Sequence, residues 1–164
     1  MANTSVFTGA DGSITLSVPQ SAEGAATEAI LTEFDTVSVG RVTDVRVEVL
    51  SDVKAFHEIG QRYATELRPG NVNVRGTIGR AYINGAMLKL LLGEAADGRP
   101  AASWVQPAMN ITLLVENAAT AGVNSTVTLH DVKLDRWTYH MPEDDFVLES
   151  VGFQALFLTV ADEG

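Results

Sequence analysis

Five stretches of the chain alternate apolar and polar residues, a pattern typical of β-strands with one buried face. These stretches are residues 13–18, 45–49, 72–80, 111–116 and 126–137. Within 126–137 the apolar positions change from odd to even numbers after Leu129, which predicts a β-bulge at His130–Asp131. Gly76 and Gly79 predict a bulge or a close approach of the backbone within 72–80.

Three segments depart from this alternation. Residues 146–160 are apolar on both faces, so we expect one strand that a helix or another subunit covers on both sides. Residues 51–71 retain scattered apolar side chains and end on a Pro-Gly-Asn turn signal, which favours an extended loop or a distorted hairpin. Residues 20–39 lack firm periodicity, so we expect a loop there, with a possible strand near 36–39.

One segment, residues 83–93, has the spacing of a helix. Its apolar residues recur every three or four positions. Asn84 can cap the first turn, and Gly93 stands where a left-handed residue ends a helix. The pattern as a whole predicts a mainly β protein with a single domain over residues 1–164 and one flanking α-helix.

Composition narrows the function classes. The chain of 164 residues has no cysteine, which excludes disulfides, thiolate metal sites and cysteine nucleophiles. No apolar run is long enough to span a membrane, and the first residues carry no secretion signal, so we expect the protein in the cytoplasm where it is made. A formal charge of −10 opposes tight binding to nucleic acid.

The charge is uneven along the chain. Residues 41–80 hold seven basic and five acidic side chains, whereas the remainder is strongly acidic. This window is either a solvated face of mixed charge or a surface that complements the acidic part of a neighbouring copy.

Catalytic signatures do not occur. The sequence has no nucleophile elbow, phosphate-binding loop or dinucleotide fingerprint, and its three histidines have no second ligand at a suitable spacing. The acidic run Glu143, Asp144 and Asp145 is more typical of a solvated turn than of a calcium loop. We therefore predict no enzyme activity and no catalytic, cofactor-binding or metal-binding residue.

Two regions carry a family resemblance. The first runs from the ELRPG turn through the strand ending in GRAYINGA to the leucine-rich helix, and the second is VTLHDVKLDRWTYHMPEDDFVLESVGFQA. Their order over residues 45–160 resembles phage-type viral tail tube proteins, which are related in fold to the tubes of contractile injection machines and type VI secretion. The resemblance implies a β-sandwich or barrel-like core with one flanking helix.

The same resemblance implies a structural role in a virion tail that is assembled in the host cytoplasm. Hexameric rings of the protein would stack into a tube, with the subunit itself not inserted in a membrane and viral DNA passing through the lumen without specific binding. Further partners would be tape measure and tail terminator or baseplate proteins, and a sheath protein if the tail contracts.

In this family the long early loop reaches the adjacent ring, a role that falls here on residues 51–71. That loop combines apolar anchors with charged neighbours, as an interface does. The inter-ring contact candidates are Phe56, Ile59, Arg62, Tyr63 and Leu67.

A DNA conduit should not be rich in cations, because each neutralised phosphate adds affinity and slows passage. Our lumen candidates are therefore Asp44 and Glu48. Arg46 lies on the same face by alternation and departs from an acidic lining, so we expect it to pair with a neighbouring carboxylate.

Two alternatives stay open. The tube of a tailocin or of a secretion-type injection machine shares the fold but carries no genome. A β-sandwich module that binds a carbohydrate or protein ligand would need exposed aromatic residues, for which Trp104, Trp137 and Tyr139 are the plausible set.

Overall fold

The computed structural model of the protein describes residues 6–120 and 122–163. Its strands are β1 (Gly12–Ser17), β2 (Val42–Ser51), β3 (Lys54–Phe56), β4 (Glu66–Arg68), β5 (Val72–Ala81), β6 (Met109–Glu116), β7 (Asn124–His140), β8 (Leu148–Ala155) and β9 (Phe157–Glu163). Its helices are α1 (Ala22–Phe34) and α2 (Ala86–Leu92), with 3-10 turns η1 (Gly9–Asp11) and η2 (Gly93–Ala96). Each alternating stretch forms a strand, so the mainly β prediction is confirmed.

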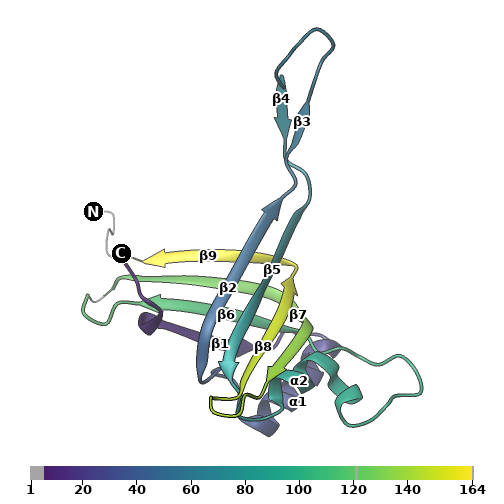
Figure 1. Cartoon of the computed structure of the whole chain (residues 1–164), viewed down its shortest axis with the longest axis vertical. Coiled ribbons are helices and arrows are strands. Elements are labelled where there is room, and N and C mark those ends of the chain that lie inside the picture. Colours follow the sequence, from purple (N-terminus) through teal and green to yellow (C-terminus); the bar gives the residue numbers. More distant parts are fainter. Residues whose placement is uncertain (1–5, 121, 164) are drawn as a thin grey trace.

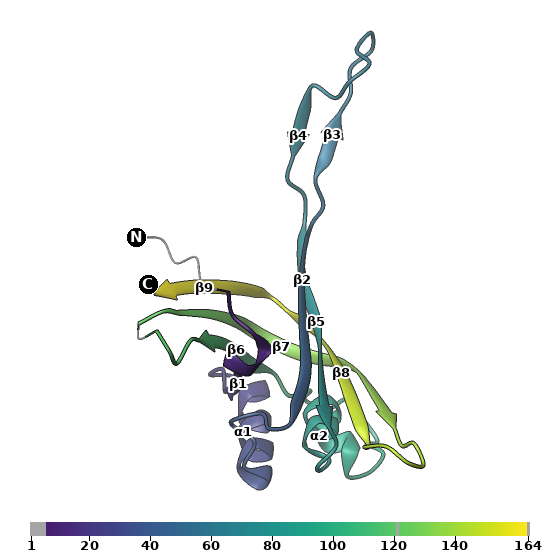
Figure 2. The ribbon, with the colours of Figure 1, turned by 60° about the vertical axis from the view of Figure 1, so that its left-hand side comes forward.

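The strands build one curled antiparallel sheet in the order β1-β6-β7-β8-β5-β2 (Figure 1). The long strand β7 joins its two halves, because its first part pairs with β6 and β9 and its second part pairs with β8. Both helices lie on the same side of this sheet (Figure 2). The strands β3 and β4 form a separate ribbon beyond β2 and β5.

The bulge predicted in β7 is confirmed. Ile111 pairs with Leu129 but Met109 pairs with Val132, so β7 holds one extra residue at this point. Asp131 takes up the bend with a left-handed backbone (φ 52°).

The prediction of one strand over residues 146–160 is wrong. The run divides into β8 and β9 at Leu156, whose N–H donates to the carbonyl of His130 at 3.0 Å. The break lies opposite the β7 bulge, because a partner strand cannot continue its register past an inserted residue. The run is also not covered on both faces, since Phe146, Leu156 and Phe157 are exposed.

The core lies between the sheet and the helices. Buried side chains from both halves of the sheet, such as Ile111 of β6 and Ile78 and Phe153 of β5 and β8, form one cluster there with Met87 and Leu90 of α2. A Cβ on Gly76 would lie 2.6 Å from the Phe153 ring and 2.1 Å from the carbonyl oxygen of Arg46. The close backbone approach predicted at this glycine is therefore confirmed.

The predicted helix over residues 83–93 is present but shorter. It begins at Ala86, whose N–H donates to the Asn84 side chain at 3.1 Å, and it ends before Gly93, which has a positive φ of 59°. Residues 83–85 stay outside the helix. Asn84 bonds to the first turn as expected, although the N-cap residue itself is Gly85. Gly93 ends the helix as expected, but its ψ of −127° lies outside the left-handed helical region that was predicted.

The loop predicted over residues 20–39 is wrong, because α1 occupies most of it and is a second helix beside the sheet. Ser21 caps this helix by accepting the N–H of Gly24 at 3.0 Å. Its buried positions begin with Gly24 and Thr27, which are not recognisably apolar and so hide the helical period. Near the possible strand at 36–39, Ser38 forms only an isolated bridge with Thr15.

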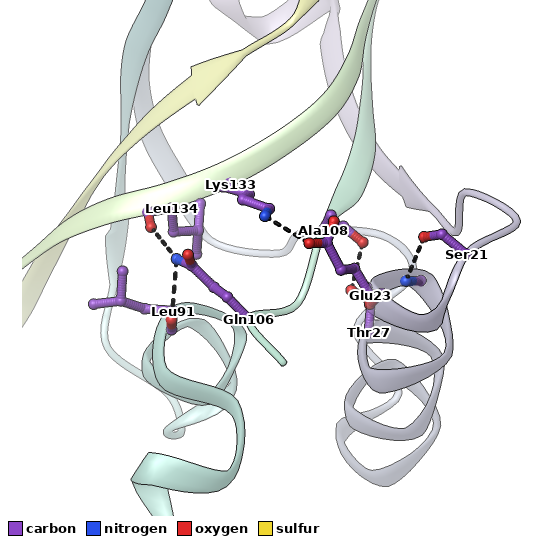
Figure 3. A network of polar contacts seen from close by, with 9 residues as sticks. Ser21, Glu23, Thr27, Leu91, Gln106, Ala108, Lys133 and Leu134 are labelled. Atoms are coloured by element: carbon purple, nitrogen blue, oxygen red, sulfur yellow. Dashed lines mark hydrogen bonds and ion pairs between the residues drawn. The ribbon is translucent and has the colours of Figure 1, made fainter. Parts of the chain in front are cut away.

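Polar contacts fix α1 and the connection before β6 against β7 (Figure 3). The ammonium of Lys133 lies 2.7 Å from the carboxylate of Glu23, and Thr27 donates to the carbonyl of Ala108. The amide of Gln106 donates to the carbonyls of Leu91 and Leu134. These contacts hold both helices under the sheet.

Candidate assembly surfaces

Residues 51–71 form an arm that projects from the body of the molecule (Figures 1 and 2). The predicted hairpin is confirmed, with Lys54 opposite Arg68 and Phe56 opposite Glu66. Every residue from 51 to 69 is exposed, so the arm has no core of its own. A two-stranded ribbon of this kind is marginally stable alone.

The inter-ring contact candidates all lie on this arm. Phe56 and Leu67 are on its strands, whereas Ile59 and Tyr63 are in the loop between them, where Ile59 is fully exposed and Tyr63 is 83% exposed. Arg68 is paired with Glu66 at 2.7 Å, but no ion pair within the described chain involves Arg62. The loop of the arm thus offers apolar groups beside a cation.

The lumen candidates lie on the sheet face that points away from the helices. Alternation along β2 places Val45, Val47 and Val49 over the core side, because they pair with Ile78, Gly76 and Val74 of β5. Asp44, Arg46 and Glu48 therefore face the other way. On that face a hollow of about 530 Å³ is lined by Arg46, Glu48, Arg75, Gly76, Thr77, Asp135, Arg136, Gly152, Phe153 and Gln154.

This polar face carries charges of both signs. Arg46, Arg75 and Arg136 line the hollow together with Glu48 and Asp135, while Asp44 lines a separate hollow beside Val45. Glu48 pairs with Arg75 at 3.3 Å, a partner that the sequence did not indicate. The expected ion pair of Arg46 does not occur among the described residues. The face as a whole is close to neutral.

The expectation of a half-buried β2 is wrong for the single chain. Val45 and Val49 are exposed, and only Val47 and Val42 are partly covered. Within the described chain β2 lies at the end of the sheet, so its outer edge has no partner strand. A long apolar edge strand is a template for pairing with another chain.

A buried ion pair joins the second half of the sheet to α2. The guanidinium of Arg80 bonds to the carboxylate of Glu149, and the indole N–H of Trp137 donates to the same carboxylate at 2.9 Å. Arg80 also donates to the carbonyl of Asn84 at 3.4 Å. Sequence reasoning missed this pair, although an acidic residue inside the apolar run 146–160 was a signal for it.

The aromatic set required by a ligand-binding module does not form one site. Trp137 and Tyr139 stack at 5.4 Å beside the Glu149 bond, while Trp104 lines a separate groove. Over residues 6–120 and 122–163 no cluster of acidic and histidine side chains suits a metal ion. In the same residues no helix has the length and apolar character needed to cross a membrane.

Comparisons with known proteins identify the fold. No protein-family profile and no curated protein matches the sequence. A chain in the cryo-EM structure of the anti-feeding prophage cap, a tube-terminating cap, matches with a TM-score of 0.67 and 12% identity, over 99% of this chain and 95% of that chain.

Two further structures agree. A chain from the sheath/tube terminator of PVC, an extracellular contractile injection system in the extended state, has a TM-score of 0.66 and 10% identity over 98% of this chain and 99% of that chain. The SPP1 tail tube has a TM-score of 0.59 and 10% identity over 96% of this chain and 80% of that chain. The protein therefore has the fold of tail tube and tube-terminator proteins, as its sequence resemblance predicted.

Proposed function

We propose that this protein is the tube subunit of a viral tail, and that its rings stack into a channel for genome delivery. The observation that carries the proposal is the fully exposed apolar arm on a body whose whole length shares the tube fold. Large exposed apolar groups mark surfaces that a partner covers. The arm supports a contact between rings made by Phe56, Ile59, Arg62, Tyr63 and Leu67.

Stacking requires that one end of a subunit contacts the opposite end of a subunit in the next ring. Such a head-to-tail contact does not close on itself, so it produces an open polymer. The arm lies at one end of the body, which suits this geometry (Figure 2). A second copy of the chain is therefore the partner of the arm.

Closure of each ring, with the six copies that the sequence resemblance implies, needs a lateral surface. Permanent interfaces bury about 2,000 Å² or more and are apolar. The unpaired edge of β2 and the exposed apolar residues around β9, namely Leu156, Phe157 and Val160, support such a contact.

The polar face of the sheet is the proposed lumen lining, with Asp44, Arg46 and Glu48 among its residues. The hollow on this face has three arginines and two carboxylates, and Arg75 is paired with Glu48. Such a lining would bind fewer phosphates than a purely basic one, because the carboxylates repel phosphate. DNA could then slide without being held. Tape measure, terminator or baseplate proteins, and a sheath if the tail contracts, would meet the ends and outside of the tube.

A second candidate is the tube or terminator of a contractile particle that carries no genome. It is favoured by the matches to the anti-feeding prophage cap and to the PVC terminator. Purified particles that contain the protein and no DNA would select this candidate over a virion tail.

The test is assembly of the purified chain. We expect rings or tubes by negative-stain electron microscopy, and we expect Ile59→Ala with Tyr63→Ala to prevent polymerisation while leaving the circular dichroism spectrum unchanged. Val105→Ala, a truncation of an exposed apolar residue on the body, is the matched control and should assemble. A chain that remains monomeric at high concentration, or normal tubes from the double variant, would refute the role of the arm.

A further inference from the structure

We propose that the loop of the arm docks on a defined surface at the opposite end of a copy in the next ring. This base patch consists of Tyr82, Ile83, Met141, Phe146 and Leu148, and it is bordered by the acidic turn residues Glu143, Asp144 and Asp145. The inference rests on the proposed tube function and names the acceptor that this function requires.

The position of the patch matches the direction of the arm. The arm leaves one end of the body, and the turn that joins β7 to β8 lies at the other end, near both helices (Figures 1 and 2). In a stack of rings with one polarity, the arm end of each copy faces the opposite end of a copy in the next ring. The base patch is thus the apolar surface that an incoming arm meets first.

The base patch is contiguous. The N–H of Tyr82 donates to the carbonyl of Val147 at 2.9 Å, which ties the end of β5 to the turn. Leu148 pairs with both Ala81 and His140, so it sits between these two strands. Phe146 is 78% exposed and Met141 is 66% exposed, although both side chains are apolar. Aromatic and methionine side chains of this kind are enriched in the cores of interfaces.

The cation of the arm loop suits the acidic turn, while the one carboxylate of that loop, Glu58, accepts a hydrogen bond from Thr65 within the arm. The turn carries three successive carboxylates, and the arm brings Arg62, which has no ion pair within the described chain, next to Tyr63 and Ile59. An ion pair at the rim of an apolar contact would favour this register over others. Apolar groups in the centre with charges at the border form the usual arrangement of a specific interface.

The large groove under the sheet is a weaker acceptor. Its volume is about 1110 Å³, and its lining includes Val72 and Val74. These residues lie at the end of β5 from which the arm projects. An arm from the neighbouring ring, arriving at the opposite end of the body, would reach this part last. Two of its three carboxylates also have partners, since Glu23 pairs with Lys133 and Asp135 accepts from Gln154. An arm residue would have to displace these contacts.

The absence of cysteine allows a direct test by crosslinking. A disulfide requires Cα atoms within roughly 7 Å of each other, so it reports contact between rings. Ala64→Cys combined with Pro142→Cys, which lie beside the contact residues without replacing one, should give a ladder of covalent oligomers after assembly and oxidation. Ala64→Cys combined with Trp104→Cys, which places the second thiol in the groove, is the matched control and should give none.

Charge reversal provides the second measurement. We expect Arg62→Glu to lower the assembly constant about tenfold or more, and we expect the same of Glu143→Lys combined with Asp144→Lys. All three changes together should restore assembly, because the two charges are then exchanged. Glu116→Lys, the same type of reversal at the end of β6, should assemble normally.

The outcomes separate this inference from the proposed function. Wild-type protein that forms no tube contradicts both. Tubes that crosslink through the Trp104→Cys variant and not through the Pro142→Cys variant overturn the base patch and leave the tube function standing. Charge reversals that fail to rescue each other have the same meaning.

Discussion

The arm continues the strands β2 and β5 of the body, yet the two regions are stabilised in opposite ways. In the body, β5 buries Ile78 and Arg80 against β8 and α2. In the arm the same ribbon continues with every residue from 51 to 69 exposed. The difference shows that the body is stabilised by its own core, whereas the apolar side chains of the arm lie at the surface of the chain.

The largest effect is expected from removal of the arm. Residues 53–70 can be replaced by Asn-Gly, because Asp52 donates to the carbonyl of Asn71 at 2.9 Å, as the flanking residues of a two-residue hairpin turn do. We expect the variant to fold with an unchanged urea midpoint, since no core contact is lost, and to form no tubes in the electron microscope. A large loss of stability would show that the arm supports the body.

The next effect concerns the body alone. Glu149→Gln should lower the free energy of unfolding by about 3–5 kcal/mol, because it leaves the charge of Arg80 buried without a counter-charge. Urea unfolding followed by the fluorescence of Trp137, which donates to this carboxylate, measures the loss.

Arg80→Met combined with Glu149→Leu is the matched control for this prediction. It should cost less than the single change, since no unpaired charge remains. A single variant as stable as the wild type would mean that the pair contributes little to the body.

The smallest expected effect lies between the two helices. The hydrogen bond from Lys89 to Glu33, with a further contribution from Asp97, raises the pKa of Lys89 above its ordinary value of 10.5. The resulting stabilisation is complete below pH 10.5 and is lost as the pH rises past the raised value. Lys89→Met should lower the melting temperature by about 2 °C or less at neutral pH. The difference from wild type should vanish at more alkaline pH, which calorimetry across this range would measure.

Local patterns were sufficient for the five alternating strands, the arm and the position of α2. Strand alternation and turn residues act over a few positions, so they can be read from the chain without its partners. The bulge in β7 belongs to this class, because a single inserted residue shifts the apolar phase. The mixture of apolar and charged side chains on the arm could be recognised in the sequence for the same reason.

Other features depended on contacts between distant residues. The helix α1 was missed because Gly24 and Thr27 are buried by their small size and by hydrogen bonds, not by apolar character. The division of 146–160 into β8 and β9 followed from the bulge on a different strand.

By itself, then, the sequence determined the strand pattern, the exposed apolar arm and the absence of recognisable catalytic motifs, since each depends on neighbouring positions. The tertiary structure alone decided that Arg80 meets Glu149 across 69 positions and that Arg75, not Arg46, pairs with Glu48. It also tied the end of β5 at Tyr82 to Val147 in the turn between β7 and β8. The physical reason is that burial, ion pairing and surface patches depend on distances that only the folded chain creates.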